Sequence, residues 1–127
     1  MVPIAAAMIA VFTLFSLSLF QVGLIAKKPW GKLAWGGNYQ VLPDKLRIAS
    51  VASIAIYILF AVVFLEKAGL ISVINNEAYT QNAMWFVAIY SGLGIFLNAI
   101  SRSPLERKVM TPVALVLGVC ALILALG

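Results

Sequence analysis

Four long apolar stretches constrain what this chain of 127 residues can fold into. They cover residues 4–26, 46–65, 83–100 and 112–126. A helix of about 20 apolar residues crosses the roughly 30 Å hydrocarbon core of a bilayer, and it satisfies its own backbone hydrogen bonds there. With 64% hydrophobic and 10% charged residues, a soluble domain of this size could not cover its apolar surface. The stretches predict a single all-α domain over residues 1–127, a bundle of four transmembrane helices.

The fourth stretch is the shortest, and a threonine–proline pair precedes it. Thr111 is a favourable N-cap residue, and Pro112 suits the first position of a helix. We therefore expect the last helix to begin at Pro112 and residues 101–112 to form a loop.

The basic residues predict the orientation of the bundle. Eight of the nine Lys and Arg residues lie in two polar segments, 27–47 and 101–112, whereas the opposite side of the predicted bundle carries only Lys67. Because cytoplasmic loops carry an excess of Lys and Arg, both segments are expected to face the cytoplasm and both termini the outside. Charge placed in this way favours contact with anionic lipid head groups and does not indicate a nucleic-acid partner.

The two basic segments also resemble each other. Residues 26–32 (AKKPWGK) align with residues 101–107 (SRSPLER), with basic residues and a proline at matching positions. A parallel repeat of two helical hairpins would produce this match. Selection for basic loops and for prolines at helix ends could also have produced it twice. Both explanations remain open from the sequence.

Residue types that commonly carry chemistry in proteins are scarce in this chain. It has no histidine and one cysteine, Cys120, which excludes an internal disulfide and a Cys/His metal centre. The four acidic residues lie in predicted loops or at helix ends, without the spacing of a catalytic pair. We therefore expect no metal, cofactor or catalytic residue, and an enzyme is the least favoured function.

Polar residues near the cytoplasmic ends of the predicted helices form a first group of candidates. Gln21 and Asn98 lie about one turn or slightly more inside the membrane from the nearest basic residue, and Ser50 and Ser53 lie at a similar depth. These side chains could meet in a polar pocket that opens toward the basic loops. Alternatively they bond across helices, which contributes only about 0.6 kcal/mol per bond.

Loop residues form a second group. Arg and Ser side chains in segment 101–107 suit phosphate oxygens, but the segment could instead serve topology and pair through Glu106 with Arg102 or with a lysine of the first loop. The Trp35–Asn38 insertion, which the second loop lacks, could cover a site or form a tight turn. The candidate ligand-binding residues are therefore Gln21, Trp35, Gly36, Gly37, Asn38, Arg47, Asn98, Ser101, Arg102, Ser103 and Arg107.

Two sets of strings resemble the signatures of a group of small four-helix bacterial membrane proteins. The first set is Pro29-Trp-Gly-Lys, Ala34-Trp-Gly-Gly, Leu42-Pro and Leu46-Arg. The second is Asn98-Ala-Ile-Ser-Arg-Ser-Pro-Leu-Glu-Arg followed by Thr111-Pro-Val-Ala-Leu. The resemblance covers nearly the whole chain. It implies a four-helix fold in a bacterial cytoplasmic (inner) membrane, and because the group is functionally uncharacterised it transfers no activity.

Three classes of function follow from these observations. The leading one is a non-enzymatic membrane protein that binds a lipid, another amphiphile or a partner subunit at its cytoplasmic face. The alternative is a small transporter or channel that acts as a homo-oligomer, as the four short helices and the suspected repeat indicate. A membrane enzyme acting on a lipid-borne substrate comes third, since no nucleophile–base pair is visible.

Overall fold

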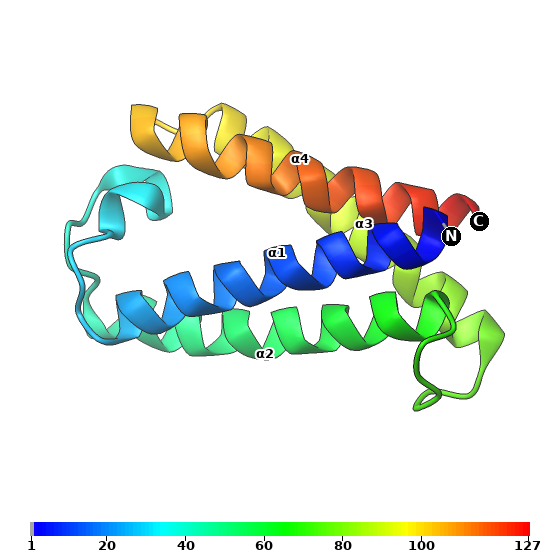
Figure 1. Cartoon of the computed structure of the whole chain (residues 1–127). Coiled ribbons are helices and arrows are strands. Elements are labelled where there is room, and N and C mark those ends of the chain that lie inside the picture. The colour runs from blue at the N-terminus through cyan, green and yellow to red at the C-terminus, as the bar shows by residue number, and fades with distance from the viewer. Residues whose placement is uncertain (1) are drawn as a thin grey trace.

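The computed structural model describes residues 2–127, apart from the side chains of Lys32 and Trp35, and every regular element in this range is helical (Figure 1). The four long helices are α1 (Val2–Ile25), α2 (Asp44–Lys67), α3 (Glu77–Ala99) and α4 (Pro104–Leu126). Two short 3₁₀ helices, η1 (Gly31–Leu33) and η2 (Trp35–Gly37), lie between α1 and α2. All four α-helices are long and apolar enough to cross a membrane. The prediction of an all-α, multi-pass membrane bundle is confirmed.

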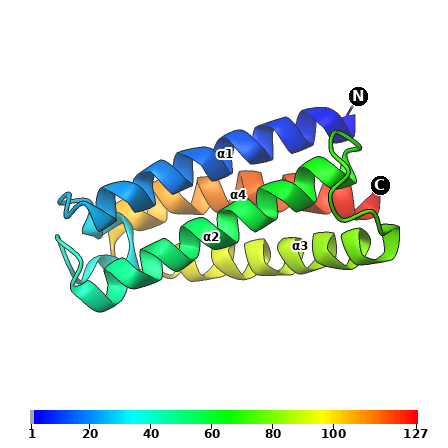
Figure 2. The same cartoon turned by 90° about the horizontal axis from the view of Figure 1, so that it is seen from below.

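The four helices form two antiparallel hairpins, α1–α2 and α3–α4. Both chain ends lie at one end of the bundle, which we call the terminal end, and the two hairpin loops lie at the other, the basic-loop end (Figures 1 and 2). Figure 1 shows that α1 and α4 are close at the terminal end and diverge toward the basic-loop end. Both hairpins run in the same direction, as a parallel repeat requires, but their loops differ in length. The repeat stays a prediction.

The close-packed core occupies the terminal half of the bundle. Its buried side chains are Ala6, Ala7, Ala10, Leu14, Phe60, Phe64, Met84, Val87, Leu117, Cys120, Ala121, Leu124 and Ala125. Alanines dominate the contribution of α1 and are frequent in that of α4, and small side chains let helix backbones approach closely in a membrane. This half of the bundle is therefore tight, and the diverging half beyond Phe60 and Leu117 is left with more space.

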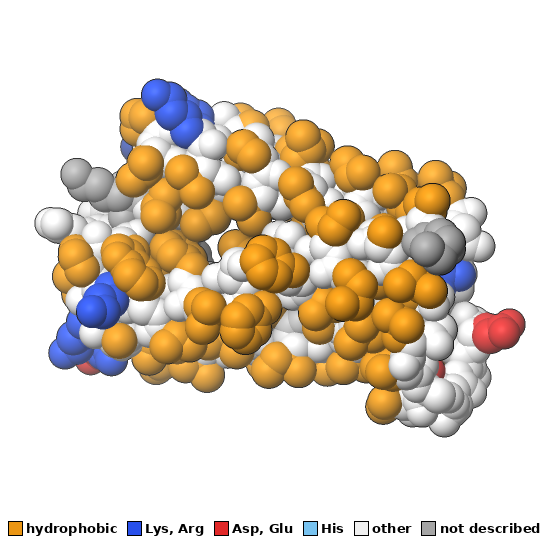
Figure 3. All heavy atoms as spheres, viewed as in Figure 1, with side chains coloured by type: hydrophobic (Ala, Val, Ile, Leu, Met, Phe, Trp, Pro, Cys, Tyr) orange, Lys and Arg blue, Asp and Glu red, His pale blue; other side chains and the backbone are white. Residues whose placement is uncertain are grey.

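Large apolar side chains also cover the outside of the bundle (Figure 3). Among them are Phe12, Ile48 and Ile89, each about 70% exposed. Lys and Arg side chains gather mainly at the basic-loop end in the same view. A continuous apolar surface of this kind is suited to lipid and would be unstable in water.

Helix α4 begins at Pro104 rather than at Pro112, so the predicted loop over residues 101–112 is wrong for most of its length. Ser103 is the N-cap, and its Oγ accepts a hydrogen bond of 3.3 Å from the N–H of Glu106. Thr111 is therefore not a cap, and Pro112 lies inside the helix. A proline removes one backbone hydrogen bond, which neighbouring helices and water can compensate in membrane proteins. The charges of residues 102–108 concealed the first turns of a helix.

Side-chain caps organise the connection between α2 and α3. The carboxylate of Glu66 accepts hydrogen bonds of 2.7–3.0 Å from the backbone N–H groups of Val73, Ile74 and Asn75. The Oδ1 of Asn76 accepts a further bond of 3.0 Å from the N–H of Tyr79 and so caps α3. Glu66 is thus committed to holding the loop at the terminal end.

Candidate functional site

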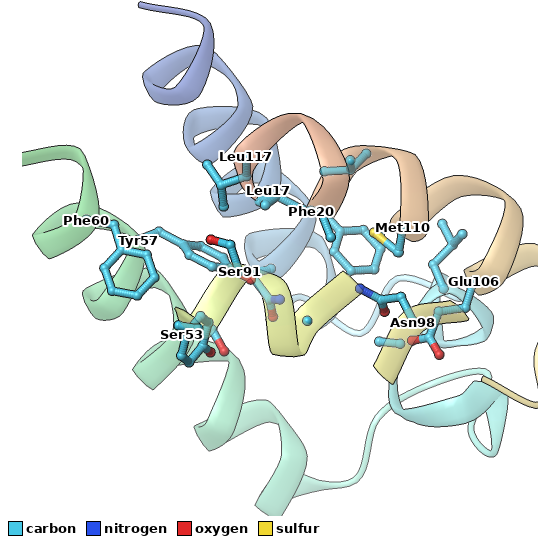
Figure 4. Close-up of a pocket in the computed structure, with 17 residues that line it drawn as sticks. Leu17, Phe20, Ser53, Tyr57, Phe60, Ser91, Asn98, Glu106, Met110 and Leu117 are labelled. Atoms are coloured by element: carbon cyan, nitrogen blue, oxygen red, sulfur yellow. The ribbon is translucent and has the colours of Figure 1, made fainter. Parts of the chain in front are cut away.

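A cavity of about 230 Å³ lies between the helices in the basic-loop half of the bundle (Figure 4). All four helices contribute to its lining, and Leu33 and Ala34 of the α1–α2 loop close it at the loop end. Along α3 it extends from Tyr90 to Asn98, slightly more than two helical turns or roughly 12 Å. Gly94 also lines the cavity, and a Cβ atom added at this position would meet nothing within 4 Å. The diverging hairpins therefore enclose usable space here.

Among the described residues, seven polar side chains line this cavity, namely Gln21, Ser53, Tyr57, Tyr90, Ser91, Asn98 and Glu106. They supply two amides, four hydroxyls and one carboxylate. The remaining lining is apolar and includes Leu17, Phe20 and Leu117. The cavity therefore offers hydrogen-bonding groups and apolar surface together.

The hydroxyl groups in the cavity differ in their partners. The Ser53 Oγ donates to the carbonyl of Ala49 in its own helix, at 3.0 Å. The Tyr57 hydroxyl lies beside the Gln21 side chain, which links α2 to α1. The Ser91 Oγ is buried and has no hydrogen-bond partner among the described residues. Because buried polar groups are rarely left unpaired, Ser91 has bonding capacity to offer to a bound molecule.

Among the described residues that line the cavity, Glu106 contributes the only charge, and its side chain is buried, with the residue 7% exposed. It lies in the first turn of α4, where the helix dipole favours a negative charge. In the usual capping box, the carboxylate at this position would accept the N–H of the N-cap residue. Here the N–H of Ser103 donates to the Ser101 Oγ at 3.2 Å instead. The carboxylate is thereby left to face the cavity.

The suggested ion pair between Glu106 and Arg102 is not formed. Among the described side chains, the ion pair present is that of Arg47 and Asp44, at 3.0 Å. The described side chains also provide no hydrogen-bond donor to the Glu106 carboxylate. In Figure 4 the side chains of Glu106 and Asn98 lie near each other at the loop end of the cavity.

Of the residues predicted from the sequence, Gln21 and Asn98 both line this one cavity, and so does Ser53. Ser50 does not, and its Oγ donates to the carbonyl of Leu46 at 3.2 Å. The structure thus brings together the predicted polar residues of three helices. Their role in binding a ligand stays a prediction.

The predicted basic and hydroxyl residues of the loops lie outside the cavity lining and hold helix ends. Arg47 donates through Nε to the carbonyl of Ile25 at 2.8 Å, which ties the end of α1 to the start of α2. Ser101 and Ser103 form the cap of α4, and Arg107 donates to the carbonyl of Ser101 at 3.0 Å. Arg102 is exposed. Helix ends carry unpaired backbone groups, and these side chains satisfy some of them.

The predicted cover of the site, residues 35–38, does not line the cavity among the described side chains. Gly36 and Gly37 have positive φ angles of 69° and 77°, and Asn38 is exposed. The side chain of Trp35 lies outside the described part of the structure. The neighbouring residues Leu33 and Ala34 are the ones that reach the cavity.

Contacts along the first loop hold it against the bundle. The Trp30 ring stacks on Phe20, with 6.2 Å between ring centroids. Gly23 makes room for that ring, since a Cβ there would lie 1.8 Å from it. The Gly31 N–H donates to the carbonyl of Gln40 at 2.9 Å. These contacts position Leu33 and Ala34 over the cavity.

Sequence reasoning missed Tyr57, Ser91 and Glu106 as lining residues. A signal for Glu106 was present, because Ser103-Pro-Leu-Glu106 has the spacing of a capping box and predicts a helix start. A helix that starts there puts Glu106, Met110 and Leu117 on one face. Tyr57 and Ser91 carry no comparable signal.

No family model matches this chain, and no curated protein or solved structure is significantly similar to it.

Proposed function

We propose that this chain is a multi-pass protein of the bacterial cytoplasmic membrane that binds a small amphiphile in its interhelical cavity. The observation that supports this most directly is the mixed lining, in which seven polar side chains of the described residues face apolar ones such as Leu17 and Leu117. A volume of about 230 Å³ is below the range of roughly 300–1,000 Å³ that holds drug-sized ligands. The ligand is therefore a small molecule or the head group of a larger one.

The basic-loop end is proposed to face the cytoplasm, with both termini outside. Lys27, Lys28, Arg102 and Lys108 are exposed at that end. The excess of Lys and Arg supports this orientation, and the resemblance to small bacterial membrane proteins supports the choice of membrane. Exposed basic side chains at the membrane surface would contact anionic lipid head groups.

Labelling of single cysteines tests the orientation. Asn38→Cys at the basic-loop end and Asn76→Cys at the terminal end are both exposed positions, and Cys120→Ala removes the natural thiol. In intact bacterial cells, a membrane-impermeant maleimide should label Asn76→Cys and not Asn38→Cys, because only the outer side is accessible. The opposite pattern would refute the orientation, and disruption of the cells should make both positions reactive.

Filling the cavity tests the binding function. Gly94→Leu projects a side chain into open space that lines the cavity, so it should abolish binding without steric damage to the neighbouring helices. Binding is measured by calorimetry on protein in lipid nanodiscs, with hexyltrimethylammonium, hexanol and hexyl sulfate as probes and empty nanodiscs as the blank for partitioning into lipid.

The matched control is Gly92→Leu. Gly92 lies on the same helix, has equally open surroundings and does not line the cavity, so this variant should bind as the wild type does. If no probe gives a signal above the blank, or if both variants bind like the wild type, the proposed function is wrong.

A second candidate, a small transporter, is favoured by one observation. The helices diverge toward the basic-loop end (Figure 1). The cavity lies in that half of the bundle, whereas the core closes the terminal half. A rocking motion of the two hairpins could expose such a site to either side in turn. Uptake of a bound probe into proteoliposomes, lost in Gly94→Leu, would support transport. The packed terminal half gives no support to an open channel through one copy of the chain.

A further inference from the structure

Glu106 gives the cavity a negative charge that its described surroundings do not balance. Among the described residues it is the one acidic residue of the lining, and no described Lys or Arg side chain lines the cavity with it. The residue is 7% exposed, and its carboxylate has neither an ion pair nor a hydrogen-bond donor among the described side chains. A buried carboxylate is normally paired, because the loss of its hydration is costly.

The helix dipole at the start of α4 offsets only part of that cost, since its effect is confined to a partial charge at the first turn. The remaining requirement is for a cation or for strong hydrogen-bond donors. The carboxylate belongs to the lining of the cavity, so a group bound there would lie beside it.

We infer that the cavity recognises a positively charged amphiphile, a protonated or quaternary amine with a short apolar chain, and that Glu106 is its counter-ion. This inference rests on the proposed function and adds the chemical class of the ligand.

The remainder of the lining fits that class. Aromatic rings of Phe20, Tyr57 and Tyr90 surround the same space, and the faces of aromatic rings attract ammonium groups. Figure 4 shows Glu106 at the loop end and Leu17 and Leu117 toward the core. If an ammonium head group lay beside Glu106, its apolar chain would therefore extend toward Leu17 and Leu117, at the end of the cavity nearer the core.

The same charge excludes the class of ligand that the loops suggest. Basic side chains on the surface attract anionic lipid head groups, but an anion inside the cavity would meet the Glu106 carboxylate, and no described cationic side chain of the lining would balance it. Surface and cavity thus select opposite charges.

Three probes that share a hexyl chain and differ in head group test this inference in nanodiscs. Hexyltrimethylammonium should bind with a Kd at least tenfold lower than that of hexanol, and hexyl sulfate should not bind above the empty-nanodisc blank. Glu106→Gln keeps the shape of the side chain and removes its charge. It should weaken binding of the cation at least tenfold and leave the Kd of hexanol within a factor of two.

The thermal stability of ligand-free Glu106→Gln separates recognition from a role in folding. Because the carboxylate lacks a described partner, the variant should melt at the same temperature as the wild type or higher. A lower melting temperature would overturn the inference, since the charge would then stabilise the fold.

Failure of the inference can be told apart from failure of the proposed function. If Glu106→Gln binds the cation as the wild type does while Gly94→Leu abolishes binding of every probe, the cavity binds amphiphiles without selecting charge. If Gly94→Leu leaves all binding intact, the probes do not occupy the cavity and the proposed function fails together with the inference.

Discussion

Phe64→Ala is expected to be the most damaging truncation in the bundle. Phe64 is the largest of the fully buried side chains, with 0% of its surface exposed, and it lies on α2 in the core of the terminal half. In soluble proteins a buried Phe→Ala change costs about 3–5 kcal/mol, from lost transfer into an apolar interior and from the cavity left behind. Lipid is as apolar as this interior, so the transfer contribution largely disappears.

The contributions that remain are lost dispersion contacts and the new cavity, and together we expect about 2–3 kcal/mol from Phe64→Ala. Titration of the detergent-solubilised protein with sodium dodecyl sulfate, followed by circular dichroism, measures the free energy of unfolding. Phe12→Ala is the matched control, because Phe12 is 72% exposed and faces the lipid. Its change should be within about 0.5 kcal/mol of zero. Equal losses in both variants would mean that the terminal half does not hold the hairpins together.

The fold was largely predictable because the physics of a membrane span depends on local sequence. A run of about 20 apolar residues must become a helix in lipid, and the structure has a helix over each of the four runs. The error in α4 came from reading charge as loop. Residues 104–111 are polar on average, but they are helical at the membrane surface, where Ser103 caps them.

The candidate site was predictable only in part. Depth in the membrane can be counted along a helix, and so Gln21 and Asn98 were expected at one level. Whether they face each other depends on the rotation and divergence of the helices, which many distributed contacts determine. Ala7, Ala10 and Ala121 let α1 and α4 pack closely at the terminal end. The two helices diverge toward the basic-loop end, and the cavity lies in the space between them there.

Sequence reasoning also assigned charged and hydroxyl residues of the loops to a ligand, whereas in the structure these side chains form hydrogen bonds with backbone groups of the chain. Arg47, Ser101, Ser103 and Arg107 all bond to backbone groups near helix ends. Arg and Ser side chains form hydrogen bonds with unpaired backbone groups at helix ends, and they form hydrogen bonds with phosphate oxygens equally well. Composition alone cannot separate the two uses.

Gly31→Ala is expected to open the first loop and to remove the cover of the cavity. A Cβ at position 31 would lie 1.9 Å from the carbonyl oxygen of Tyr39, and a backbone atom cannot rotate away as a side chain can. The loop segments that contain Gly31 and Gln40 would separate, and the hydrogen bond from the Gly31 N–H to the Gln40 carbonyl would be lost. Leu33 and Ala34 lie two and three residues after Gly31 in the sequence. The cover that they form over the cavity would therefore be displaced.

Two measurements follow Gly31→Ala. Limited proteolysis should cut within residues 26–43 at least tenfold faster than in the wild type, and hexyltrimethylammonium should bind at least tenfold more weakly. The free energy of unfolding should fall by only about 1–3 kcal/mol, because the core lies in the other half of the bundle. Asn38→Ala is the control, an exposed position in the same loop that does not line the cavity, and it should change neither readout. Rapid proteolysis with undiminished binding would show that the loop does not cover the cavity, and the four helices alone would then have to retain the ligand.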